Sequence, residues 1–422
     1  MAPKLERFVS PGKGNGLRAA ASIRRGELLV STEPLACCVS KKLVREVCHH
    51  CFTRLETLLR CSQCKTARYC NITCQKQAWS VHKRECKCLR GLLPRFPTDS
   101  VRLAARLIFA LVCFWTFSLF CSLKITDLTS MPEQKKQGLS QLASMLELYL
   151  HEEVPDLTQE SKVHPSCREA LSLVAKVVCN CFTITDGELQ ESGVGLYPSL
   201  SLLNHDCRPN CMMVFEGTKV QLRAVQDISP GEELTISYIE SLSLTEDRQR
   251  QLEDQYRFTC HCQRCDSEDK DGLMLSGEEA AWCPLKEALP RLEELKHCSH
   301  LLSAAGGEVP DENLYKLRIT DMALDASIHL QRWEEAMRYG VKTLPVYRLY
   351  YPDPHPVHGI QLMRVGKLQH YLEHIEEALD TFKQAYEVLK LTHGDDHPVM
   401  TDLMTRMEEC RCEVDHKSSS RH

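Results

Sequence analysis

Eight potential metal ligands lie close together near the start of this 422-residue chain, within residues 48–86. They are seven cysteines and one histidine, and they come in pairs separated by two or three residues. Zinc takes four soft ligands in a tetrahedron, and a two-residue gap places both thiolates of a pair on one ion. The stretch therefore predicts two closed structural zinc sites, formed by Cys48, Cys51, Cys61, Cys64, Cys70, Cys74, His82 and Cys86. Spacing alone leaves open whether the pairs are used sequentially or interleave.

The cysteine content of the whole chain supports metal binding over disulfide bonding. There are 24 cysteines, and the N-terminal residues MAPKLERFVS contain no apolar run of the kind found in secretory signals. Without export, many cysteines indicate metal thiolates and some free thiols. Few apolar residues separate the paired ligands, so metal must supply much of the folding free energy of that stretch.

Length and charge bound the class of protein. A chain of 422 residues predicts two to four domains, and 43% hydrophobic with 26% charged residues is ordinary for a globular protein. The net charge of −5 is unevenly spread, because residues 41–90 hold twelve Lys and Arg against three Asp and Glu. An acidic body suits a basic peptide substrate, and the basic stretch suits an acidic partner or nucleic acid. Charge that serves solubility alone is the alternative.

An uncharged apolar run covers residues 107–123, LIFALVCFWTFSLFCSL. Its 17 residues fall short of a comfortable membrane span, and runs of this length are more often buried helices. We expect a buried helix and no association with membranes.

Two polar motifs flank short β-rich segments in residues 198–238. The first, NHDCRPN at 204–210, combines amide, imidazole, thiol and guanidinium groups. The second, GEELTISY at 231–238, is a turn signal leading into a strand that ends on a tyrosine. Residues 212–215 and 220–225 read as two further strands around a turn. Either motif alone is equally compatible with a β-meander carrying a polar loop.

The C-terminal third predicts stacked helices. WEEAM at 333–337 is echoed by IEEAL at 375–379, and HPV at 355–357 by HPV at 397–399, both at an offset of 42 residues. A fixed period with two amphipathic helices indicates helical hairpins of tetratricopeptide type. Two copies are few for a free-standing solenoid, so we expect this region to lean on the preceding domain.

Together, the two polar motifs resemble those of the SET domain of protein lysine methyltransferases, which cross in a knot-like arrangement. The eight-ligand stretch resembles the zinc-binding MYND module. A MYND module inserted after the first SET strands is the layout of the SMYD family, and RCSQCKTARYC, KRECKCL, VGLYPS and FTCHCQRC extend this resemblance over nearly the whole chain. The implied fold is α+β and multidomain: a SET β-fold, an inserted MYND module and a C-terminal α-helical tetratricopeptide-like domain.

This resemblance also implies domain limits. They are the N-terminal part of the SET domain at 1–46, the MYND module at 47–87, a helical SET insert at 88–180, the SET core at 181–240, a post-SET zinc segment at 241–272 and the helical C-terminal domain at 273–422.

Zinc ligation follows from the same resemblance. In the family the MYND pairs interleave, so that Cys48, Cys51, Cys70 and Cys74 bind one ion and Cys61, Cys64, His82 and Cys86 the other. A polar helix containing EDRQR at 246–250 leads to Cys260, Cys262 and Cys265, which need a fourth ligand for tetrahedral zinc. In the family it is Cys207, and a third zinc there would pin the post-SET segment against the SET core. Free thiols on a loop are the alternative.

The resemblance further implies S-adenosylmethionine as cofactor. The glycine-rich turn at 12–16 resembles the family's loop for the amino-acid end of the cofactor. Tyr238 is expected to provide the catalytic hydroxyl, with Tyr256 and Phe182, beside Thr183, as walls of the channel for the target lysine. The cofactor contacts implied are Lys13, Gly14, Asn15, Asn180, Ser201, Leu203, Asn204, His205 against the adenine, Tyr238 and Phe258.

One segment departs from the family pattern. Members usually have a polar stretch with Tyr, Glu and Asn in the helical insert, where this chain has an apolar run, and no tyrosine occurs between Tyr69 and Tyr149. A rival hypothesis is therefore a zinc-dependent adaptor whose MYND and helical surfaces bind partners and whose methyltransferase site is weakened, as the altered segment 111–130 suggests. A third reading makes the basic stretch a DNA-binding zinc module, with affinity that falls steeply with salt.

The favoured function is transfer of a methyl group from S-adenosylmethionine to lysine of histone or non-histone proteins, with three Zn²⁺ ions. A protein or peptide lysine is the expected substrate. We expect protein partners on the MYND and C-terminal domains, weak DNA binding, a monomer, and a location in cytoplasm and nucleus.

Overall fold

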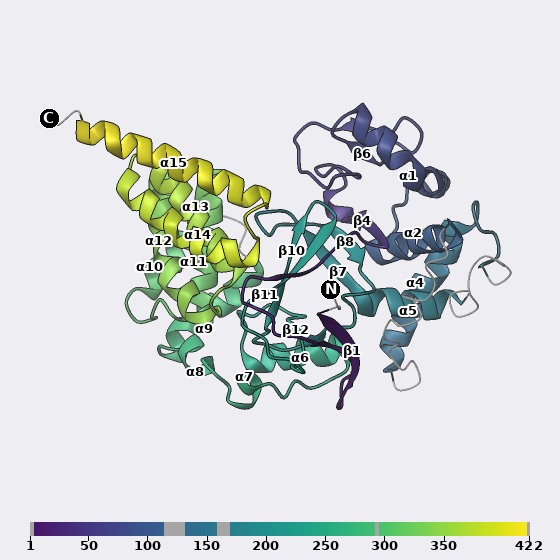
Figure 1. Cartoon of the computed structure of the whole chain (residues 1–422), viewed down its shortest axis with the longest axis horizontal. Helices are drawn as coiled ribbons and strands as arrows, with labels where there is room; N and C mark the ends of the chain where they lie inside the picture. The colour runs from purple at the N-terminus through teal and green to yellow at the C-terminus, as the bar shows by residue number, and fades with distance from the viewer. Residues whose placement is uncertain (1–3, 114–130, 158–168, 292–294, 420–422) are drawn as a thin grey trace.

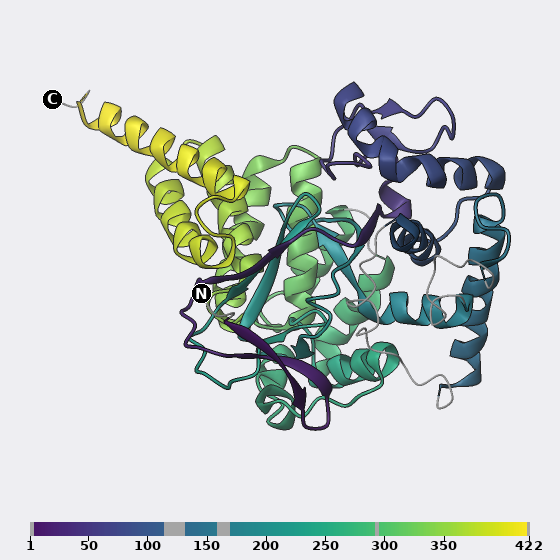
Figure 2. The same ribbon diagram turned by 45° about the vertical axis from the view of Figure 1, so that its right-hand side comes forward.

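A computed structural model describes residues 4–113, 131–157, 169–291 and 295–419. Figure 1 shows a small module around β6 (Arg68–Tyr69) and α1 (Ile72–Leu92), a middle region of short β-sheets, and packed helices on both sides of that region. The last helix, α15 (Pro398–Ser419), extends away from the sheets in both views (Figures 1 and 2). The predicted α+β multidomain fold is confirmed.

Strands from distant parts of the chain form the middle region. They pair as the hairpin β1–β2, the antiparallel sheets β10–β11–β3 and β4–β8–β7, and the parallel pair β12–β9. Both strands expected between the polar motifs are confirmed as β10 and β11. The bounds are β1 Leu5–Ser10, β2 Gly14–Ala19, β3 Leu28–Thr32, β4 Ala36–Val39, β7 Cys181–Thr185, β8 Glu191–Leu196, β9 Asn204–His205, β10 Cys211–Glu216, β11 Lys219–Ala224 and β12 Thr235–Ile236.

The parallel pair joins the two polar motifs. Thr235 lies opposite Asn204 and Ile236 opposite His205, and the Asp206 amide donates to the Ile236 carbonyl at 3.0 Å. Asn210 fastens the pair, since its Oδ1 accepts the Thr235 amide at 2.9 Å and its Nδ2 donates to the Glu233 carbonyl at 2.8 Å. The Asn210 side chain of the first motif thus takes the place of a backbone partner for two peptide groups of the second motif.

The zinc-ligand module and the helical insert pack together. The module contains β5 (Leu59–Arg60), β6 (Arg68–Tyr69) and α1 (Ile72–Leu92), and the insert contains α2 (Asp99–Cys113), α4 (Glu133–Leu150) and α5 (Ala170–Asn180). Helix α2 holds the first part of the apolar run, and its residues 107–109 and 111 are buried. The rest of that run lies outside the described residues. Among the described helices, none has the length and apolar content needed to cross a bilayer.

A buried carboxylate connects the module to the insert. Glu85 of α1 is 0% exposed and is paired with Arg102 at 2.9 Å and Arg106 at 2.6 Å, both on α2. The same guanidiniums donate to β4, from Arg102 to the Val39 carbonyl at 2.8 Å and from Arg106 to the Cys37 carbonyl at 2.7 Å. One cluster therefore fixes α1, α2 and β4 relative to one another.

The C-terminal part is helical, and the 42-residue repeat is confirmed. Trp333 and Ile375 begin α12 and α14, and the two HPV copies begin α13 and α15. Its helices are α6 Thr245–Tyr256, α7 Gln263–Asp266, α8 Asp271–Met274, α9 Glu279–Ala288, α10 Leu295–Ala305, α11 Leu314–His329, α12 Trp333–Tyr350, α13 Pro356–Tyr371, α14 Ile375–Thr392 and α15.

The repeated histidines explain both helix starts. Nδ1 of His355 accepts the Val357 amide at 3.3 Å, and Nδ1 of His397 accepts the Val399 amide at 3.2 Å. Each imidazole therefore caps a helix in the way that Asn or Asp does elsewhere. Because Nδ1 of His397 accepts, its Nε2 carries the proton and donates to the Phe215 carbonyl of β10 at 3.1 Å. The helical domain leans on the β10–β11–β3 sheet through this bond, as expected from its small number of repeats.

We predict that Glu85→Gln destabilises the protein by about 3–5 kcal/mol, because two buried guanidiniums lose their counter-charge. Denaturant unfolding followed by tryptophan fluorescence measures the change. Glu46→Gln is the matched control, since Glu46 pairs with Arg54 at 2.7 Å on the surface and its loss should cost less than about 1 kcal/mol. Equal effects of the two substitutions would contradict the role given to the buried cluster.

Candidate active site and zinc clusters

The structure brings the twelve predicted metal ligands into three sets of four, interleaved as the resemblance implied. In each set the four ligand atoms lie within 4.8 Å of one another. Zinc–sulfur bonds of about 2.3 Å in a tetrahedron put sulfurs roughly 3.8 Å apart. The observed separations fit, at 3.4 Å for Cys51–Cys70, 3.8 Å for Cys61–Cys86 and 3.5 Å for Cys207–Cys265. The three sets suit three structural zinc ions.

A carboxylate orients the ring of His82, the histidine of the second set. Nε2 of His82 lies 3.6 Å from Cys64 Sγ, on the side where the ion would bind, and Nδ1 faces Glu85 Oε2 at 3.7 Å. A carboxylate behind a ligating imidazole fixes the ring and raises its basicity. Glu85 therefore serves both this zinc site and the contact with α2.

Tyr238 lies at the junction of the two polar motifs. It follows β12, its amide donates to His205 Nδ1 at 3.0 Å, and its hydroxyl donates to the Leu203 carbonyl at 2.5 Å. The Tyr256 ring is 4.8 Å away between centroids, and the Phe258 ring 6.4 Å. Burial raises the pKa of Tyr238 and raises the pKa of Tyr256 to about 12, so both phenols are protonated and neutral at pH 7.

His205 connects Tyr238 to the third zinc set. Burial lowers its pKa to about 4, so the ring is neutral. Because Nδ1 accepts the Tyr238 amide, Nε2 carries the proton and points to Cys207 Sγ at 3.2 Å. One imidazole thus contacts both the tyrosine and a zinc thiolate. The ring is only 4% exposed and lies 5.9 Å from the Phe258 ring between centroids.

Glu233 holds the glycine-rich turn against the first motif. Its Oε1 accepts Asn204 Nδ2 at 2.7 Å, its Oε2 accepts Ser10 Oγ at 3.1 Å, and Lys13 Nζ lies 3.7 Å from the same oxygen. A Cβ on Gly16 would lie 2.8 Å from Glu233 Oε1, so a side chain there would disturb this contact. The close approach explains the glycine.

A cavity of about 860 Å³ opens beside Tyr238 and Tyr256. Helix α4 forms one wall with Leu139 and Leu142, and the start of β7 forms another with Cys181 and Thr183. Residues of α5 (Ala175, Val178 and Cys179) and residues 254–257 at the end of α6 also line it, and Lys135 Nζ on α4 donates to the Asp254 carbonyl. Mainly apolar walls with a few polar groups are typical of sites for small ligands and single side chains.

Comparisons with known proteins agree with this geometry. The SET domain profile matches residues 14–239. Human histone-lysine N-methyltransferase SMYD3 is 44% identical over 97% of this chain and 98% of that protein. The chain belongs to the SMYD family. Human N-lysine methyltransferase SMYD2 is 33% identical over 96% of this chain and 98% of its own, and mouse histone-lysine N-methyltransferase Smyd1 is 33% identical over 94% of this chain and 88% of its own. A solved structure of the SET domain of LSMT bound to lysine and AdoHcy has a TM-score of 0.32 and 12% identity, covering 98% of this chain and 89% of that chain, which is too distant to place residues.

Most of the site residues expected from the SMYD resemblance gather around the β9–β12 pair. Asn204 Nδ2 lies 3.4 Å from the Asn15 carbonyl, which joins the glycine-rich turn to the first motif. Ser201 Oγ lies 3.2 Å from the Tyr197 carbonyl and 3.4 Å from the Asn180 carbonyl, so it lies beside the end of α5. The group comprises Lys13, Gly14, Asn15, Asn180, Ser201, Leu203, Asn204, His205, Tyr238, Tyr256 and Phe258.

Phe182 is placed differently from its neighbours on β7. Cys181 and Thr183 line the cavity beside Tyr238, and alternation along a strand turns Phe182 to the other face. Its ring meets Tyr197 edge-on at 5.9 Å and packs on the SET core. A role for Phe182 in the lysine channel stays a prediction.

Several supporting residues were not predicted from the sequence. Glu233 and Asn210 lie inside the two SET motifs, so the motifs could have marked them as candidates. Arg248 was part of a polar helix, with nothing to distinguish it from Glu246 or Arg250. It is 0% exposed and lies against the third zinc set, with Nη2 3.5 Å from Cys265 Sγ.

We predict that Cys260→Ser lowers the zinc content from three ions to two per chain and weakens binding of S-adenosylmethionine. The reason is that Tyr256 and Phe258 stand on the segment that this zinc fastens. Metal analysis by mass spectrometry and calorimetric titration measure the two effects. Cys412→Ser, at an exposed thiol outside the three sets, should change neither. Three zincs in Cys260→Ser would refute the third site.

Proposed function

We propose that this chain transfers a methyl group from S-adenosylmethionine to the side-chain amine of lysine in histones and other proteins. Its SMYD relatives are named histone-lysine and N-lysine methyltransferases. The observation that carries the proposal is Tyr238, held by the Leu203 carbonyl and the His205 ring at the wall of the cavity. That position is the one in which a phenol would meet both a methyl donor and an amine.

Alignment is the chief task of this site. Bound S-adenosylmethionine would supply a sulfonium methyl group that the lysine amine attacks in line, with the C–S bond breaking as the C–N bond forms and S-adenosylhomocysteine as the leaving group. The Tyr238 hydroxyl donates its proton to Leu203, so its oxygen presents lone pairs to an amine N–H or to weak C–H contacts. Because the phenol stays neutral at pH 7, Tyr238 orients the reactants and does not act as the base. The expected cofactor contacts are those around β9 and the glycine-rich turn.

The lysine must be neutral to react. An apolar, partly aromatic cavity disfavours the ammonium form and lowers the pKa of a lysine that enters it, and a neighbouring sulfonium adds to this effect. Tyr256 stands beside Tyr238 as one wall of the cavity. We propose that the lysine loses its proton on entering between these walls, without a dedicated base.

We predict that Tyr238→Phe folds normally and binds S-adenosylmethionine, but loses about 10²-fold or more in turnover, because alignment of the amine is lost. Methyl transfer to a histone mixture with radiolabelled cofactor measures the rate. Tyr386→Phe is the control, since this partly buried tyrosine of α14 lies outside the cavity and should keep full activity. Turnover at the wild-type level in Tyr238→Phe would exclude the proposed role.

The experiment that tests the function itself is a calorimetric titration of the purified chain with S-adenosylmethionine, with zinc measured on the same sample. Three zincs with clear binding support the methyltransferase. Three zincs without binding favour the adaptor hypothesis, in which residues 111–130 weaken the cofactor pocket. Residues 114–130 of that segment lie outside the described part of the chain, so binding is the decisive measurement.

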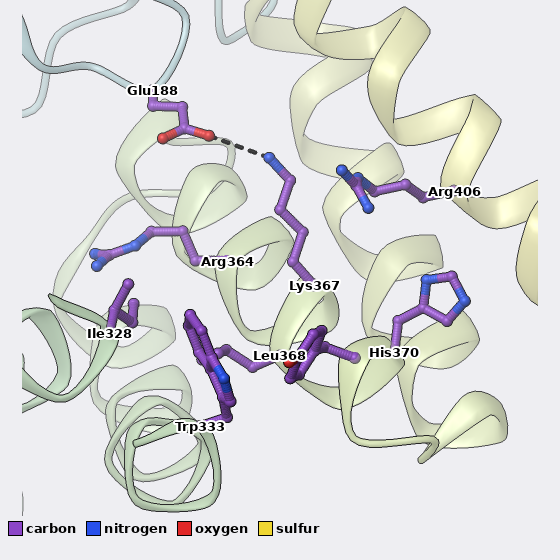
Figure 3. Close-up of a pocket in the computed structure, with 9 residues that line it drawn as sticks. Glu188, Ile328, Trp333, Arg364, Lys367, Leu368, His370 and Arg406 are labelled. Carbon is purple, nitrogen blue, oxygen red and sulfur yellow. Dashed lines mark hydrogen bonds and ion pairs between the residues drawn. The ribbon is translucent and has the colours of Figure 1, made fainter. Parts of the chain in front are cut away.

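We propose that protein partners contact the C-terminal helices. A hollow of about 620 Å³ is lined by Trp333 and Tyr371, whose centroids are 5.1 Å apart, and by Arg364, Lys367 and Arg406 (Figure 3). The three cations pair with Glu188 in the lining and with Asp325 and Asp402 just outside it, and an acidic protein segment would exchange these surface ion pairs for its own carboxylates. Lys367 ties the hollow to the SET lobe through its ion pair with Glu188 at 3.1 Å.

Other expectations remain proposals of the same kind. The basic MYND module offers a surface for acidic partners and for weak, salt-sensitive DNA binding. We propose a monomer that is present in cytoplasm and nucleus, where both histone and non-histone lysines are within reach.

A further inference from the structure

The third zinc set is surrounded by cationic groups that neither zinc ligation nor methyl transfer explains. Arg248 of α6 is 0% exposed, and its Nη2 lies 3.5 Å from Cys265 Sγ. Its other hydrogen bonds go to neutral acceptors, from Nη1 to the Ser243 carbonyl at 2.6 Å and from Nη2 to Thr245 Oγ1 at 2.8 Å. Asp271 lies on its far side, with Oδ1 at 4.0 Å. The thiolates are thus the nearer negative groups.

A second guanidinium, that of Arg264, lies near the same zinc set. Arg264 directly precedes the ligand Cys265, is 3% exposed and lies within electrostatic range of Cys207. Its Nη2 is buried, and it has no hydrogen-bond partner among the residues that the structure describes. A buried donor without a partner is costly unless nearby negative charge compensates it.

Simple electrostatics explains why two cations are needed. Four thiolates on one Zn²⁺ leave two negative charges, and a buried net charge is expensive without counter-charge. Two guanidiniums are opposite to that charge in sign and equal to it in number. Hydrogen bonds to ligating sulfurs also hold the ligands in place and tune their affinity for the metal.

We propose that Arg248 is a positioning residue which, together with Arg264, neutralises the Cys207–Cys260–Cys262–Cys265 zinc site. The two cations help the site to retain its metal. They also keep the Cys207 thiolate in contact with His205, whose ring accepts the Tyr238 amide. This role is separate from methyl transfer and stands whether or not the chain is an active enzyme.

Zinc release tests the proposal without cofactor or substrate. The full chain is mixed with a chelator and a zinc-sensitive dye, and the loss of each of the three ions is followed in time. Arg248→Met, which keeps volume but removes charge, should release one ion about 10–100-fold faster than the wild type. Arg248→Lys should be intermediate, and the two MYND ions should leave at unchanged rates and serve as internal references.

A matched control separates charge from mechanical support. Gln249, the next residue, fastens the same loop without charge, since it donates to the Cys260 carbonyl at 2.7 Å and accepts the Cys260 amide at 2.8 Å. Gln249→Ala should release zinc near the wild-type rate. Alkylation by N-ethylmaleimide, mapped by mass spectrometry, should reach Cys207 and its three partners sooner in Arg248→Met alone.

Two results would overturn the inference. One is a wild-type rate of zinc release from Arg248→Met, and the other is a Gln249→Ala variant that loses zinc as fast as Arg248→Met. If Arg248→Met does not fold, Arg248→Lys and Arg264→Met decide the question in the same assay, and unchanged release from both would refute it.

Discussion

The parallel pairing of β9 with β12 is the constraint on which the site depends. Two polar motifs about thirty residues apart are held side by side by only two residues of strand each, and the Asn210 side chain supplies what the short ladder lacks. Tyr238 leaves β12 directly over His205 because of this pairing. Glu233 reaches back from the same motif to the glycine-rich turn. Loss of the pairing would separate the tyrosine, the imidazole and the turn at once.

Zinc thiolates add a second level of support. The SET sheets are small, and the segment with Tyr256 and Phe258 has little core of its own beyond its cysteine ligands and Leu252. A metal that draws on Cys207 from the first motif and three cysteines from the later segment fixes both to one centre. The same centre contacts the Tyr238 strand through His205. The structural zinc site is therefore connected to the candidate catalytic tyrosine through a single side chain, that of His205.

Local patterns could be read from the residues themselves, whereas long-range contacts were either implied by the family resemblance or missed. Paired cysteines predicted zinc because two-residue spacing is itself the geometry, whereas interleaving of the pairs required a family resemblance. The repeat predicted helices but not the helix-capping role of His355 and His397, which depends on imidazole orientation. Arg248 was hidden in a polar helix, since composition does not reveal which charged residue of a helix faces inward. Phe182 was expected in the lysine channel, and strand alternation does not reveal which face of β7 lines the cavity, because that depends on the packing of α4, far away in the sequence.

The Glu85 cluster bears on how this protein can be dissected. The sequence of the MYND module suggests a zinc-binding unit that folds by itself. In the structure, however, Glu85 on its long helix α1 forms ion pairs with two arginines on α2 of the SET insert. A fragment containing the module alone would keep an acid without its cations, and the remaining chain would keep two cations without their acid. The inserted module therefore depends on α2 for its stability. Grafting this zinc module elsewhere would require carrying part of α2 with it.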